Sequence, residues 1–130
     1  MGVLAEGWSS RAHGHGDLYA GELAVSPDFT HDRTLYYGLL GLARSTDGGR
    51  NWMAPADTTV VSFRSCVQYF PNAASLISVG RGGVSAFSND DGKHWTNFGA
   101  LGLYTLSVAK SGEAVWAAGP DGAVARLVLE

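Results

Sequence analysis

Ser45-Thr-Asp-Gly-Gly-Arg-Asn-Trp52 and Ser88-Asn-Asp-Asp-Gly-Lys-His-Trp95 are two copies of one pattern, Ser-x-Asp-x-Gly-x-x-Trp. The copies begin 43 residues apart, and agreement at four fixed positions is not expected by chance. A fixed period of this size is typical of proteins built from small repeated units of structure. The chain is therefore predicted to consist of repeats of about this length.

Each position of the pattern has a structural role in a tight hairpin turn. The aspartate carboxylate can accept hydrogen bonds from backbone N–H groups that the turn directs inward, and the glycine permits a positive φ. The tryptophan covers the turn with a large apolar surface while its N–H seeks an acceptor. Because turn formation accounts for every position, direct binding of a sugar is the weaker interpretation. The residues assigned this structural role are Ser45, Asp47, Gly49, Trp52, Ser88, Asp90, Gly92 and Trp95.

The composition favours one globular domain made of many short strands. The 130 residues are 45% hydrophobic and only 16% charged, which excludes a disordered chain. The 18 glycines and the lack of long helical periodicity favour short strands joined by tight turns. A net charge of −3, with the basic residues scattered, predicts no nucleic-acid partner.

The single cysteine, Cys66, lies in an apolar–polar alternation and is predicted to be a buried thiol rather than a nucleophile. The first 11 residues lack the basic and apolar regions of a signal peptide, and no apolar run approaches membrane-spanning length. The sequence therefore predicts a cytoplasmic protein with no membrane partner, or a secreted one if a leader has been removed. No cofactor is predicted.

Strand signals recur in the same order along the chain. Alternating, β-branched and aromatic segments are bounded by turns rich in Pro, Asn, Asp and Gly. A short fourth strand is expected after Trp52 and after Trp95, and Trp8 marks the end of a third, worn copy of the pattern. With a spare strand at about residues 3–9, these segments give three four-stranded units in a single domain, residues 1–130. The other predicted strands are 22–26, 34–37, 42–44, 62–69, 75–79, 84–87, 103–109, 114–118 and 123–130.

The pattern resembles the Asp-box, or bacterial neuraminidase repeat (BNR), of sialidase-like β-propellers. The stretch from Ser26 to Leu35, Ser-Pro-Asp-Phe-Thr-His-Asp-Arg-Thr-Leu, also resembles a strand connection common in bacterial Asp-box repeat proteins. That class includes sialidases, xyloglucanases, sortilin-type receptors and photosystem assembly factors. The resemblance implies an all-β propeller of four-stranded antiparallel blades, with three blades in this chain. It identifies a fold rather than an activity.

Three blades are too few to close a propeller, because closed rings usually need at least four. An open arc would leave strand edges and apolar blade faces exposed. We therefore predict a homodimer that closes a six-bladed ring, with the strand at about residues 3–9 pairing with the partner's strand 123–130. The alternative is that the chain is a fragment of a longer propeller.

The resemblance also predicts where a ligand would bind. In Asp-box propellers the boxes lie between the third and fourth strands, and ligands usually bind the opposite face. That face would be formed by the fourth-to-first and second-to-third connections, which leaves His31, Asp32 and Arg33 on the box face. The ionisable candidates on the ligand face are His13, His15, Asp17, Asp57, Arg81 and Asp121, and the candidate strand arginine is Arg64.

His13, His15 and Asp17 form a ligand-like cluster that could hold a zinc ion with one open position. Solvated histidines in a Gly-rich loop are the alternative interpretation. Sialidases carry an arginine triad and an Arg-Ile-Pro motif, and this chain has no Arg-Ile-Pro. Arg64 alone is a weak match, and a strand-face arginine paired with an acid on a neighbouring blade explains it more simply.

No catalytic residue is assigned, because sequence spacing does not place Asp57 and Asp121 together as an acid–base pair. The predicted function is a non-catalytic binding or assembly module, whose partners are a second copy of itself and a carbohydrate or protein ligand. Two alternatives stay open: a glycoside-processing enzyme with a site formed across chains, and a structural interaction protein without a small ligand. A deep pocket lined by carboxylates would favour the enzyme, and a shallow apolar or mixed face would favour binding.

Overall fold

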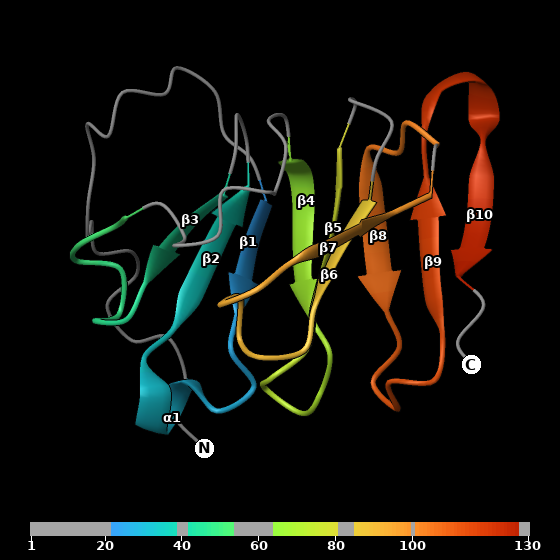
Figure 1. Ribbon diagram of the computed structural model, residues 1–130. Coiled ribbons are helices and arrows are strands. Elements are labelled where there is room, and N and C mark those ends of the chain that lie inside the picture. The colour runs from blue at the N-terminus through green and yellow to red at the C-terminus, as the bar shows by residue number, and fades with distance from the viewer. Residues whose placement is uncertain (1–21, 39–41, 54–63, 81–84, 100, 128–130) are drawn as a thin grey trace, which may run out of the picture.

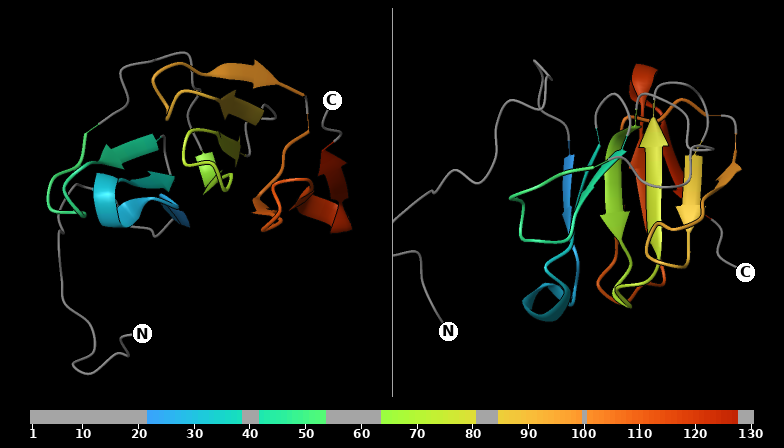
Figure 2. Two further views of the ribbon diagram at one scale, coloured as in Figure 1. Left: turned by 90° about the horizontal axis from the view of Figure 1, so that it is seen from below. Right: turned by 60° about the vertical axis from the view of Figure 1, so that its left-hand side comes forward.

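The computed structural model of the protein describes residues 22–38, 42–53, 64–80, 85–99 and 101–127 (Figure 1). Within these ranges the chain is all-β apart from two short helical turns, and ten strands form three small antiparallel sheets. Figure 2 shows the sheets next to one another in chain order. We call them the first, second and third sheets.

Each sheet is a meander in which consecutive strands pair. The first sheet contains β1 (Glu22–Val25), β2 (Leu35–Gly38) and β3 (Leu42–Ser45). The second contains β4 (Arg64–Tyr69), β5 (Leu76–Gly80), β6 (Ser85–Ser88) and β7 (Thr96–Phe98). The third contains β8 (Thr105–Val108), β9 (Val115–Ala118) and β10 (Val124–Leu127). The helical turns are α1 (Phe29–Asp32) and the 3-10 turn η1 (Pro120–Gly122).

This arrangement confirms the predicted all-β class and the order of three repeated units. The second sheet has four strands, as predicted. In the first sheet, a single bridge between Arg44 and Met53 stands where the fourth strand was predicted to begin, and residues 54–63 lie outside the described ranges. The spare strand at residues 3–9 and the last three residues of the predicted strand 123–130 also lie outside them.

The connection between β1 and β2 contains α1, where the sequence predicted only a turn. The backbone N–H of Asp32 donates to the carbonyl oxygen of Asp28 at 3.0 Å, which closes one helical turn, and Arg33 ends it with a φ of 54°. The Asp32 carboxylate then accepts the Ser26 hydroxyl at 2.6 Å and the Thr34 backbone N–H at 2.9 Å. These bonds tie the ends of β1 and β2 together. A helix of four residues is too short to leave a periodic signal in the sequence.

The same pattern of strand pairing recurs in the three sheets and defines which residues are equivalent. The first two strands of each sheet end at equivalent residue pairs, which are Val25 with Leu35, Tyr69 with Leu76, and Val108 with Val115. The next residues along the second strands are therefore equivalent too; they are Tyr36, Ile77 and Trp116. Their cross-strand partners on the third strands are Arg44, Phe87 and Arg126 respectively.

The apolar core lies between adjacent sheets. The cluster between the first and second sheets includes Tyr36, Val67, Tyr69, Leu76 and Trp95. The cluster between the second and third sheets contains Cys66, Phe70, Ile77, Val79, Leu103, Leu106 and Val115. All five residues of β5 are buried, because neighbouring sheets cover both faces of this strand. Cys66 is buried as predicted, and burial raises the pKa of its thiol.

Antiparallel pairing puts the connections at two opposite ends of the sheets. The turns that follow β3 and β6 lie at the same end as α1, and η1 lies at the other end (Figure 1). None of the helices in the described ranges has the length and apolar character of a membrane span.

Candidate functional site

The first copy of the sequence pattern, residues 45–52, forms a turn closed by side-chain hydrogen bonds; we call it the first box turn. The Ser45 hydroxyl donates to Oδ1 of Asp47 at 2.8 Å and accepts the backbone N–H of Gly49 at 2.9 Å. Oδ1 of Asp47 also accepts the backbone N–H of Asn51 at 2.9 Å, and Oδ2 accepts the Asn51 side-chain amide at 2.7 Å. The indole N–H of Trp52 donates to the Gly49 carbonyl oxygen at 2.9 Å. The turn therefore uses most of its own polar groups internally.

The second copy, residues 88–95, repeats this geometry and is called the second box turn. The Ser88 hydroxyl donates to Oδ1 of Asp90 at 2.9 Å and accepts the Gly92 N–H at 2.9 Å. Oδ1 of Asp90 accepts the backbone N–H of His94 at 2.9 Å, and Oδ2 of Asp90 lies 2.6 Å from Nδ1 of the His94 ring. The Trp95 indole donates to the Gly92 carbonyl oxygen at 3.1 Å.

Both turn carboxylates are stabilised in their ionised form. The backbone and side-chain N–H groups of Asn51, with the Ser45 hydroxyl, lower the pKa of Asp47 from 3.8 to about 2. The backbone N–H and the side chain of His94 lower the pKa of Asp90 well below its usual range. A carboxylate whose pKa is lower in the folded chain contributes stability above its unfolded pKa, and that contribution is lost as the pH falls through the folded value.

Acidification should therefore destabilise the protein between about pH 4 and pH 2, partly through Asp47. We expect Asp47→Asn to show a smaller loss of stability over this window than the wild type, because asparagine does not titrate. Thermal melts at closely spaced pH values measure the effect. Thr46→Ala changes an exposed residue of the same turn and should keep the wild-type dependence. An Asp47→Asn variant with the wild-type acid profile would contradict the assignment.

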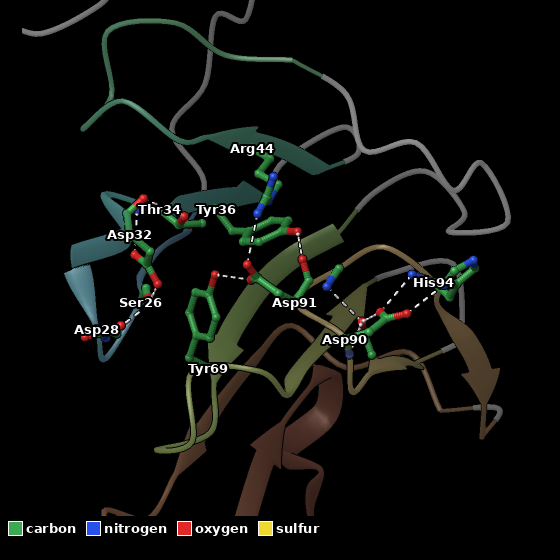
Figure 3. A network of polar contacts seen from close by, with 12 residues as sticks. Ser26, Asp28, Asp32, Thr34, Tyr36, Arg44, Tyr69, Asp90, Asp91 and His94 are labelled. Atoms are coloured by element: carbon green, nitrogen blue, oxygen red, sulfur yellow. Dashed lines mark hydrogen bonds and ion pairs between the residues drawn. The ribbon is translucent and has the colours of Figure 1, made fainter. Parts of the chain in front are cut away.

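A polar network joins the second box turn to the first sheet (Figure 3). Its centre is Asp91, whose carboxylate accepts Nη2 of Arg44 at 2.9 Å and the Tyr69 hydroxyl at 2.7 Å. The carbonyl oxygen of Asp91 accepts the Tyr36 hydroxyl at 2.9 Å, and its N–H donates to the Ala74 carbonyl at 2.7 Å. With a φ of 57°, Asp91 holds a left-handed conformation that aspartate tolerates better than most residues. We call these residues the Asp91 network.

The aromatic members of the Asp91 network are packed against one another. Tyr36 is wholly buried, lies edge-on to Tyr69 and Trp95, and has the Arg44 guanidinium 5.9 Å from its ring centre. Burial raises the pKa of both tyrosines well above their usual range. Both hydroxyls donate hydrogen bonds to Asp91, so the network links the first and second sheets.

Sequence analysis did not single out the Asp91 network. Asp91 occupies a variable position of the pattern, one residue after the aspartate that the pattern fixes. The first box turn has Gly48 at the equivalent position. The signal that could have found the network was an acidic residue at this position together with an arginine on the preceding sheet. Recognising that pair requires knowing how the two sheets pack against each other.

Two of the residues predicted for the ligand face lie in the described part of the chain. Asp121 is exposed in η1 with a φ of 59°, at the end opposite the box turns. Arg64 begins β4 opposite Gly80, and its side chain lies outside the described part. His13, His15, Asp17, Asp57 and Arg81 are outside it altogether, so the ligand face and the zinc cluster stay predictions. Within the described ranges, no group of three His, Cys, Asp or Glu side chains could hold a metal ion.

The described surface includes two hollows. An apolar cavity of about 220 Å³ separates the second and third sheets, and its lining includes Phe98, Leu101, Leu103, Leu106 and Leu127. A more polar hollow of about 510 Å³ at the box-turn end is lined by Phe29, Arg33, Asp47, Gly48 and Arg50. Neither of these two is lined by the pair of carboxylates that hydrolysis of a glycosidic bond requires.

No protein-family model matches the chain, and no curated protein matches it. An ancestral GH74 enzyme superposes with a TM-score of 0.65 at 19% identity, over 81% of this chain and 16% of the enzyme. Hydrazine synthase from Kuenenia stuttgartiensis superposes with a TM-score of 0.57 at 11% identity, over 83% of this chain and 33% of the other. The chain thus spans a third or less of the length of these proteins. Likeness at such low identity shows the fold alone, which is an all-β, propeller-like array of antiparallel sheets.

Proposed function

We propose that the protein is a non-catalytic binding or assembly module of the Asp-box propeller class, and that two copies close a six-bladed ring. The observation that carries this proposal is that polar side chains of the protein bond to its own backbone and side chains. In both box turns and in the Asp91 network, carboxylates, hydroxyls and guanidinium groups bond to the turns and sheets themselves. Such groups hold a scaffold in shape and are not poised for acid–base or nucleophilic chemistry.

The edge of the third sheet supports ring closure. Its strand order is β10-β9-β8, so within the described residues β10 pairs on one side only. An exposed strand edge is a template for another strand. In the proposed ring, the partner's residues 3–9 supply that strand, and the two-fold axis repeats the contact. Each copy thereby completes the other's last blade.

The ring predicts a dimer in solution. Light scattering on the purified chain should give about twice the monomer mass of 13.7 kDa. Deleting residues 1–9 should shift the mass towards the monomer, because the strand that completes the partner's blade is lost. A wild-type mass near 13.7 kDa would overturn the ring, and a dimeric deletion variant would overturn closure by strand exchange alone.

A glycoside-processing enzyme with a site formed across chains is the second candidate, and the fold shared with an ancestral GH74 enzyme favours it. Release of reducing sugar from xyloglucan or of sialic acid from a sialoside, by the wild type and not by a heat-denatured control, would establish this candidate. Binding to the same compounds without release would support the non-catalytic module.

A further inference from the structure

The two internal interfaces show how one sheet of this protein receives the next. We call the side of a sheet that points to the next sheet in the chain its following face, and the other side its preceding face. On the following face of the first sheet, Tyr36 is wholly buried against the second sheet. On the following face of the second sheet, the equivalent Ile77 has an exposed fraction of 2%. This position is thus the centre of an interface each time a sheet follows.

The third sheet presents the same position to solvent. Trp116 is equivalent to Tyr36 and Ile77, and its exposed fraction is 51%. Its cross-strand partner Arg126 lies 5.9 Å from the Trp116 ring centre, as Arg44 lies 5.9 Å from the ring of Tyr36. An aromatic side chain under an arginine therefore occurs on two of the three following faces, buried on the first sheet and exposed on the third.

The first sheet presents the complementary surface. Leu23 and Val25 lie on its preceding face, with exposed fractions of 53% and 55%. Their equivalents on the second sheet, Val67 and Tyr69, are buried against the first sheet. Leu106, the equivalent of Leu23 on the third sheet, is buried against the second. Among the described residues, each copy therefore has one following face and one preceding face that no other sheet covers.

We infer that the following face of the third sheet, centred on Trp116 and Arg126, binds the preceding face of the first sheet, centred on Leu23 and Val25, in a second copy of the chain. The inference rests on the proposed dimer and adds which faces meet. A two-fold axis makes the contact twice and leaves neither apolar face open. The chain's two internal interfaces supply the template for the packing.

The inferred contact lacks one ion pair that the internal interface contains. In the internal interface, Arg44 pairs with Asp91, and the equivalent position of the first box turn is Gly48. Arg126 would therefore meet a glycine rather than a carboxylate. Gly48 has a φ of 74°, and a Cβ atom there would meet only Phe29, at an ordinary 3.8 Å. Because Asp91 holds a φ of 57° at the same position, an aspartate fits this turn.

The first test removes the apolar contact. Trp116→Asp and Leu23→Asp should each raise the dimer dissociation constant at least about tenfold, measured by sedimentation equilibrium. Met53→Asp, at a residue with an exposed fraction of 67% on neither outer face, should change it less than about twofold. The double variant Leu23→Lys with Trp116→Asp should regain part of the affinity, since opposite charges then face each other in both contacts. Circular dichroism verifies that each variant is folded.

The outcomes separate this inference from the proposed function. A monomeric wild type overturns the dimer and the face pairing together. A dimeric wild type whose folded Trp116→Asp and Leu23→Asp variants keep its affinity overturns the face pairing and leaves the dimer in place.

The second test adds the missing carboxylate. Gly48→Asp should tighten the dimer about twofold to fivefold at low salt, as an exposed ion pair does, and added salt should reduce the gain. In the Arg126→Gln background the gain should vanish. An unchanged affinity in Gly48→Asp, or an equal gain without Arg126, would overturn the inferred placement of the two sheets.

Discussion

Replacing Gly92 with alanine is expected to lower the free energy of unfolding by about 2–4 kcal/mol. A Cβ atom at Gly92 would lie 1.7 Å from the hydroxyl oxygen of Tyr36 and 2.6 Å from its Cζ atom, so the ring must move. Tyr36 is wholly buried and packs edge-on against Tyr69 and Trp95, which leaves no space to receive it. Gly92 also has a φ of 80°, which adds the cost of a left-handed alanine.

Gly99→Ala separates the two causes. Gly99 has a φ of 71°, and a Cβ atom there would meet nothing within 4 Å. This variant should therefore lose only the backbone contribution, about 1 kcal/mol. Urea denaturation of both variants measures the difference. Equal losses at Gly92 and Gly99 would show that Tyr36 does not set the requirement for glycine.

Replacing Asp91 with alanine is the second large effect, and we expect a loss of about 2–4 kcal/mol. The variant leaves the Arg44 guanidinium and the Tyr69 hydroxyl without their acceptor at a half-buried junction between two sheets. The same substitution at Asp121, which is exposed and has a φ of 59°, reports the cost of the left-handed backbone alone. That control should lose about 1 kcal/mol.

A double-mutant cycle between Asp91→Asn and Tyr69→Phe tests the network itself. Asparagine keeps the tolerance for a left-handed backbone and removes the charge. We expect a coupling free energy of about 0.5–3 kcal/mol between the two substitutions. Strict additivity in urea denaturation would mean that the 2.7 Å bond between the two side chains contributes nothing measurable.

The order of the strands could be predicted from the sequence because each repeat carries period-two alternation and strong turn residues. The two copies of the box pattern gave the period, and β4 to β7 follow the predicted order through the second copy. The four residues of α1 could not be predicted, since Ser26, Asp32 and Thr34 fix that connection by side-chain bonds that have no periodicity. Local patterns reveal elements, and bonds between elements appear only with the fold.

The candidate site was less accessible from the sequence for the same reason. Arg44 and Asp91 lie 47 positions apart and meet because the first and second sheets pack face to face. No local sequence pattern encodes that packing. The role inferred for Trp116 and Arg126 likewise depends on their equivalence to Tyr36 and Arg44, which only the strand pairing reveals. The predicted ligand face rests on loop residues such as His13 and Asp57, whose spacing in sequence does not define a distance in space.

The burial of β5 has a consequence for where the folded chain opens first. In a linear array, stability is a sum of intrinsic contributions and couplings between nearest neighbours. Among the described sheets, the second has two such couplings and the outer two have one each, so opening fluctuations should begin at the ends and reach β5 last. Closing the ring would give every sheet two neighbours and remove the ends at which unfolding starts. The lifetime of the folded chain would then depend on its own concentration.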